Sequence, residues 1–155
     1  MTYAHGVAEP SLEANIEIVR GQLSDDRAQQ VLDFWARQCA LQGAAAHERL
    51  REVVCLALGA DGEIVGVNSV FPHNLGLIGG RPFWVYRSCL APDAGSMAPE
   101  MINSAFATLE GEFNQKSEGP IGLCVLVADR AEMERHPETL WPRKTTFSPS
   151  GEVRG

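Results

Sequence analysis

The sequence has no excess of basic residues and no long apolar run. Its 155 residues include 13 Lys and Arg against 20 Asp and Glu, a formal net charge of -7. This charge repels a phosphate backbone, so we expect no nucleic-acid binding. No apolar run approaches the roughly 20 residues that a membrane span needs, and MTYAHGVAEPS lacks the basic and apolar regions of a signal peptide. We therefore expect a cytoplasmic protein with no membrane partner.

Metal-ligand spacing is also missing. The four cysteines form no C-x-x-C pair, and the four histidines lack the i, i+4 spacing of a helical zinc pair, so we expect no metal site. Each cysteine lies among apolar neighbours, which favours buried thiols in a reduced compartment over disulfides or metal ligands. No Ser-His-Asp or Cys-His arrangement can be assembled from the spacing, so covalent catalysis has no support. The cysteines are Cys39, Cys55, Cys89 and Cys124.

The hydrophobic and helical patterns that are present predict one domain over residues 15–155, after a flexible leader at 1–14. Alternating or continuous apolar runs predict strands, and apolar residues at helical spacing predict helices. The expected strands are 16–21, 53–60, 63–71, 83–91 and 121–128, and the expected helices begin at 24, 44, 99 and 129. This order predicts an α/β (α+β) class domain, with a mixed, mostly antiparallel central sheet flanked by helices.

Two connections stand out. Ala60-Asp61-Gly62 predicts a hairpin turn between two strands, because Asp-Gly tolerates positive φ. The strand FWVYRSCLA is followed by the small-residue turn PDAGSMA and then by a helix that begins near Pro99. A strand, a small-residue turn and a helix N-terminus form an arrangement that often receives a phosphate group. The alternative is an ordinary connection in an α/β domain.

With "GADGEIVGVNSVF" as a hairpin and a proline-bearing turn after the fourth strand, the order of elements resembles the GNAT superfamily of acyl-CoA-dependent N-acyltransferases. The resemblance implies acetyl-CoA or another acyl-CoA as co-substrate and an amine acceptor on a small molecule or a protein. It implies pantetheine along the strand edge at Cys89 and Leu90. The pyrophosphate would lie at Gly95, Ser96, Met97 and Ala98. Family members usually begin this turn with Arg or Gln, whereas this chain has Asp93 there, an acidic residue beside an anion.

An amine must lose a proton before it attacks a thioester, so a base is required. His73, at the end of the third expected strand, is the candidate base, and the alternative is a solvated loop histidine. Tyr86 is the candidate proton donor to the thiolate, and the alternative is a half-buried strand aromatic. Many GNAT enzymes place that tyrosine after the fifth strand, where this chain has Trp141. Arg87, a charge within a strand, either pairs with a carboxylate or holds an acidic ligand.

A second function stays open beside acyl transfer: a non-catalytic GNAT-like interaction module whose cofactor site has decayed. The chain ends at Gly155, where the family normally adds closing strands. We therefore expect that the domain is truncated, or that a second copy or another protein completes its sheet edge.

Overall fold

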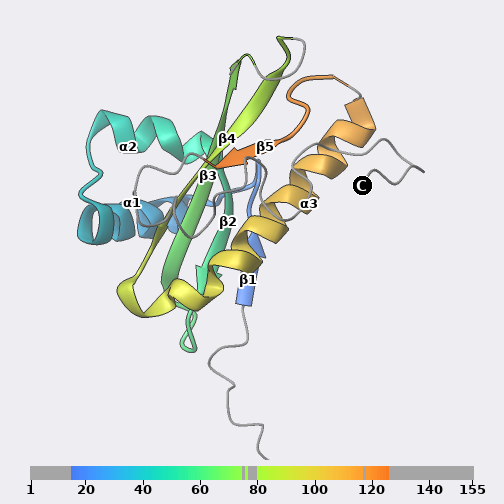
Figure 1. The fold of residues 1–155 in the computed structure, drawn as a ribbon. Helices are drawn as coiled ribbons and strands as arrows, with labels where there is room; N and C mark the ends of the chain where they lie inside the picture. Colours follow the sequence, from blue (N-terminus) through green and yellow to red (C-terminus); the bar gives the residue numbers. More distant parts are fainter. Residues whose placement is uncertain (1–14, 75, 77–79, 117, 126–155) are drawn as a thin grey trace, which may run out of the picture. The chain divides into compact units, whose positions relative to one another are not determined.

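The computed structural model describes residues 15–74, 76, 80–116 and 118–125 (Figure 1). The expected leader, the helix expected from residue 129 and Trp141 lie outside these residues. Within them, no helix is both long enough and apolar enough to cross a bilayer.

Among the described residues, five strands form one sheet in the order β1-β2-β3-β4-β5. β1 pairs antiparallel with β2, β2 pairs antiparallel with β3, and β4 pairs parallel with β5, which confirms the expected mixed sheet. The elements in chain order are β1 (Asn15–Ile18), α1 (Asp25–Cys39), α2 (Ala44–Arg49), η3 (Leu50–Glu52), β2 (Val53–Leu58), β3 (Ile64–Asn74), β4 (Pro82–Leu90), η4 (Pro92–Met97), α3 (Ala98–Lys116) and β5 (Leu123–Val125). The chain divides into two compact units, Met1–Ser69 with Ser88–Ala105 and Val70–Arg87 with Phe106–Gly155.

In the first unit, helix α1 begins where the sequence predicts. The Ser24 side chain accepts a hydrogen bond from the Arg27 N–H at 3.1 Å, which satisfies one of the N–H groups that a helix start leaves unpaired. Val31, Phe34 and Trp35 are buried on the inner side of the helix. They belong to a hydrophobic cluster with residues of β2 and β3, namely Val53, Leu56, Ile64 and Val67.

The other face of the sheet in this unit carries a second cluster, formed by Ala57, Ala94, Met97 and Met101. Gly66 lies under it, where an added Cβ would crowd the neighbouring side chains. A Cβ at Gly66 would lie 2.6 Å from Leu90 Cδ2 and 3.1 Å from both Ala57 Cβ and Met101 Sδ. The sheet therefore lies between α1 on one face and η4 with the first turns of α3 on the other (Figure 1).

A buried amide joins the sheet to α3. The β2–β3 register shifts between Val53 and Cys55, so the Cys55 N–H lies at an irregular point of the ladder. The Asn68 side chain, which is fully buried, accepts from this N–H at 2.7 Å and donates to the Met101 C=O at 3.1 Å. Both polar ends of Asn68 are thus satisfied inside the core.

In the second unit, β5 lies beside the first half of β4. Trp84, Val85 and Tyr86 are in register with Leu123, Cys124 and Val125, and the Trp84 N–H donates to the Gly122 C=O at 2.8 Å. The expected strand bounds at residues 71 and 83 are wrong, because β3 continues to Asn74 and β4 begins at Pro82. Asn74 closes the connection with hydrogen bonds to Gly76 and Gly80.

Candidate functional site

The candidate cofactor site is the connection from β4 through η4 to α3, which lies in the first unit from Ser88 onward. The expected turn is not an open loop but a 3-10 helix, Pro92–Met97, that runs directly into the 19-residue helix α3. Its buried residues, Ala94 and Met97, belong to the core cluster below α3. Packing of these two side chains therefore fixes the turn against the sheet.

Gly95 and Ser96 lie on the outer side of this turn, and both are exposed. A Cβ built at Gly95 would meet no atom within 4 Å, so the backbone there is open to an approaching group. The serine hydroxyl beside it is both a donor and an acceptor. The α3 N-terminus follows at Ala98, where the helix dipole favours negative charge. Sterically, this outer side leaves the Gly95 backbone accessible.

The hydrogen bonding of the turn is less favourable. The Ala94 N–H donates to the Ala91 C=O at 2.9 Å, and the Ala98 N–H donates to the Gly95 C=O. These two donors are used within the turn, so they do not face outward. The Ala91 N–H is also used, because it donates to the Val65 C=O of β3 at 2.8 Å. A diphosphate here would depend on the remaining N–H groups and on Ser96.

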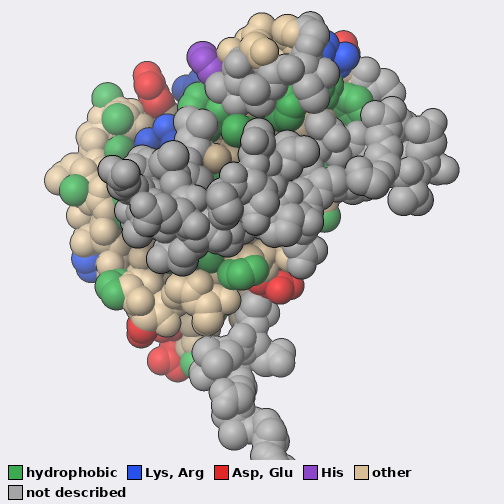
Figure 2. Space-filling view, in the orientation of Figure 1, with side chains coloured by type: hydrophobic (Ala, Val, Ile, Leu, Met, Phe, Trp, Pro, Cys, Tyr) green, Lys and Arg blue, Asp and Glu red, His purple; other side chains and the backbone are tan. Residues whose placement is uncertain are grey.

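The charge of the turn opposes an anion. Residues 91–100 contain Asp93 and Glu100, both exposed, and no Lys, Arg or His. Figure 2 shows Asp and Glu side chains at the lower end of this view, where Figure 1 places the β2–β3 hairpin and η4. Two like charges near a diphosphate weaken its binding, most strongly at low ionic strength.

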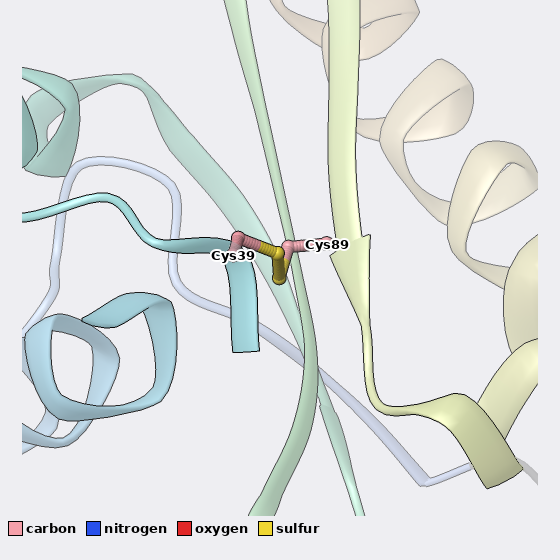
Figure 3. The surroundings of a disulfide bond; sticks show 2 residues. All are labelled: Cys39 and Cys89. Carbon is pink, nitrogen blue, oxygen red and sulfur yellow. A yellow bond between two sulfur atoms is a disulfide. The ribbon is translucent and has the colours of Figure 1, made fainter. Parts of the chain in front are cut away.

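The expectation of four thiols is wrong for two cysteines. Cys39, at the end of α1, and Cys89, near the end of β4, form a disulfide with their Cα atoms 6.4 Å apart (Figure 3). Apolar neighbours in the sequence do not reveal this pairing, because the two residues are 50 positions apart and only the packing of α1 on the sheet brings them together. Among the described residues, Cys55 and Cys124 are free.

Neither free thiol suits nucleophilic chemistry. Burial raises the pKa of the Cys55 thiol to about 11, although its hydrogen bond with Asn68 acts in the opposite direction. Burial also raises the pKa of Cys124. Both thiols therefore stay protonated near neutral pH, and the thiolate is the reactive form.

The two candidate catalytic residues lie in the second unit, on opposite faces of the sheet. The ring of His73, which is exposed, lies 6.4 Å from that of Phe71, and the Arg87 guanidinium lies 4.4 Å over the same ring. His73, Phe71 and Arg87 therefore share one face. Tyr86, which is 5% exposed, precedes Arg87 in β4 and points to the other face by strand alternation. The structure does not bring His73 and Tyr86 together.

Within the described residues, no group of three or more His, Cys, Asp or Glu side chains is placed to hold a metal ion. The residue that sequence reasoning missed is Asn68. A polar residue in an otherwise apolar strand is the signal for it, since a buried amide needs partners.

Comparison with solved structures gives the fold: it is that of the GNAT acetyltransferases. An aminoglycoside antibiotic 6'-N-acetyltransferase from Acinetobacter haemolyticus aligns with a TM-score of 0.53 and 15% identity over 90% of this chain and 98% of that chain. An acetyltransferase from Trypanosoma brucei aligns with a TM-score of 0.49 and 14% identity over 88% of this chain and 99% of that chain. At these identities the likeness concerns the fold alone. The protein-family models and the curated proteins give no match.

Proposed function

We propose that the protein is an acyl-CoA-dependent N-acyltransferase that transfers an acetyl or another acyl group to an amine of a small molecule or a protein. One observation carries the proposal. In a chain with the GNAT fold, β4 leads through a turn with open space at Gly95 into the N-terminus of a 19-residue helix. Such an end offers a favourable helix dipole to an anion, and the N–H groups that the turn does not use internally can add to it.

In this proposal the backbone of Cys89 and Leu90 lies along pantetheine, and the turn Gly95, Ser96, Met97 and Ala98 meets the diphosphate. The Met97 side chain is 7% exposed and packs in the core, so only its backbone is available. Ser96 adds a hydroxyl donor. Bound acyl-CoA supplies an activated thioester carbonyl.

Only one of the two candidate catalytic residues can serve a single reaction centre, because His73 and Tyr86 lie on opposite faces. We favour Tyr86, because it belongs to β4, the strand that leads along the chain into the candidate cofactor turn. Its hydroxyl would donate a proton or a hydrogen bond to the leaving sulfur. In the alternative, His73 takes the place of Tyr86 as the catalytic residue. It would then accept a proton from an amine that approaches from the His73 face of the sheet.

The test is thermal unfolding with and without acetyl-CoA. A ligand that binds only the native state raises the melting temperature by several degrees when it saturates the site. Ser96→Asp should remove this shift because it adds a third negative charge at the turn. Asp93→Asn should tighten binding roughly three- to tenfold at low salt, since it removes a like charge. The control is Glu48→Gln, which makes the same charge change on an exposed position of α2.

Catalysis is tested by mass spectrometry of acetyl-CoA and a panel of amines. Consumption of the thioester with formation of an amide supports acyl transfer, and Tyr86→Phe should slow it. A thermal shift without consumption would mean a binder without chemistry.

The second candidate is the non-catalytic interaction module, and the acidic turn favours it. Asp93 and Glu100 would not hinder a module that no longer binds CoA. An unchanged melting temperature at millimolar acetyl-CoA would support this candidate. In that case, a second copy or another protein that completes the sheet edge is the expected partner.

A further inference from the structure

We propose that the Cys39–Cys89 disulfide is an exchangeable redox switch, opened by thiols such as glutathione, that controls the order of the β4–η4–α3 connection. The effect on acyl-CoA binding rests on the proposed function. The exchange itself rests on the placement of the two cysteines.

The two ends of the disulfide differ in accessibility. Cys39 lies in the exposed last turn of α1, whereas Cys89 is 8% exposed and belongs to the cluster under α1. Figure 3 shows the bond crossing from the end of α1 to β4. A thiolate that attacks a disulfide must reach one sulfur from the side away from its partner. The sulfur that an external thiolate can reach is therefore Cys39 Sγ.

The thiolate of one glutathione attacks Cys39 Sγ, a new S–S bond forms, and Cys89 leaves as a thiolate that takes up a proton. A second glutathione attacks the mixed disulfide and releases Cys39 as a thiol. Two electrons pass from two glutathione molecules, which become glutathione disulfide, to the protein.

Reduction of the disulfide frees two chain segments, the C-terminal end of α1 at Cys39 and the end of β4 at Cys89. Ala40, directly after Cys39, has a φ of 52°, a left-handed conformation that is unfavourable for a residue with a Cβ. It is the only described non-glycine residue with positive φ. The helix end is otherwise held by hydrogen bonds to the Trp35 C=O. Without the covalent link, we expect this end to relax away from β4.

Cys89, the cysteine of this disulfide in β4, is next to the candidate cofactor site in the chain. Cys89 directly precedes Leu90, and η4 begins at Pro92. Anchoring Cys89 to α1 therefore restrains the strand end that leads into the turn. In the expected cytoplasmic location, glutathione reduces accessible disulfides, so the bond would respond to the redox state of the cell.

In the experiment, the full chain is equilibrated in glutathione buffers of graded redox potential. Its free thiols are then alkylated, and the mass of the protein is measured by mass spectrometry. We expect two more alkylated cysteines, Cys39 and Cys89, as the buffer becomes reducing. Hydrogen exchange of the reduced form should be at least severalfold faster in 36–42 and 88–98 and unchanged in 53–58. Cys39→Ser should reproduce this pattern without reductant, and Cys124→Ser, which keeps the bond, should not.

Four results decide the proposal. A bond that survives the most reducing glutathione buffer overturns it, as does reduction that leaves exchange at 88–98 unchanged. Equal acetyl-CoA shifts for both redox forms would overturn the control of binding while the proposed function stands. If neither form binds acetyl-CoA but exchange at 88–98 still depends on redox state, the proposed function fails and the switch stands.

Discussion

The buried amide of Asn68 gives the sharpest test of the core. Asn68→Ala removes the acceptor for the Cys55 N–H and the donor to the Met101 C=O, and it leaves both backbone groups without these partners in a site from which water is excluded. The orphaned Cys55 N–H costs about 1–3 kcal/mol, and the Met101 C=O, which keeps its helical partner in α3, loses a bond worth about 0.5–1.5 kcal/mol. The free energy of unfolding should therefore fall by roughly 1.5–4.5 kcal/mol.

Urea unfolding followed by fluorescence measures this loss as a lower midpoint at an unchanged m-value. Asn74→Ala is the matched control. Asn74 also makes two side-chain hydrogen bonds, at 2.7 Å to the Gly80 C=O and at 2.8 Å from the Gly76 N–H, but it is exposed. Water replaces both partners there, so its loss should stay below about 1 kcal/mol. Equal losses for the two variants would refute the argument that burial makes the Asn68 bonds costly to lose.

Three further variants test other elements by the same urea assay. Gly66→Ala should destabilise by about 1–3 kcal/mol, because its Cβ would lie 2.6 Å from Leu90 Cδ2, and a neutral result would mean that the sheet has room there. Ser24→Ala should cost about 1 kcal/mol through loss of the α1 cap, whereas Ser24→Asp should cost little. Replacing Cys39 and Cys89 together by serine should cost about 4 kcal/mol, the chain-entropy value for a closed loop of 50 residues. If wild-type stability is the same with and without reductant, that estimate is wrong.

Local signals in the sequence predicted most of the elements. The helix start expected at residue 24 matches α1, which the Ser24 side chain caps, and Asp61-Gly62 marked the β2–β3 hairpin, where Gly62 has a φ of 82°. These signals succeed because capping and turn geometry depend on residues only a few positions apart. The order of the elements then predicted the GNAT fold, which the comparison confirms.

The predictions that failed depend on residues far apart in the chain. The apolar neighbours of Cys39 and Cys89 predicted buried thiols, but the packing of α1 on the sheet decided that the two sulfurs meet. The third strand was expected to end at residue 71, yet β3 continues to Asn74. The short turn after β4 looked open, yet Ala94 and Met97 pack into the core and wind it into a 3-10 helix.

The sequence by itself determined which segments become strands and helices, because periodicity, caps and turn residues act locally. It also determined the acidic character of the turn before α3, since Asp93 and Glu100 are part of that segment wherever it lies. Only the tertiary structure decided the disulfide, the role of Asn68 and the separation of His73 from Tyr86. Each of these depends on which faces of distant strands and helices meet, and burial across the whole sheet sets that choice.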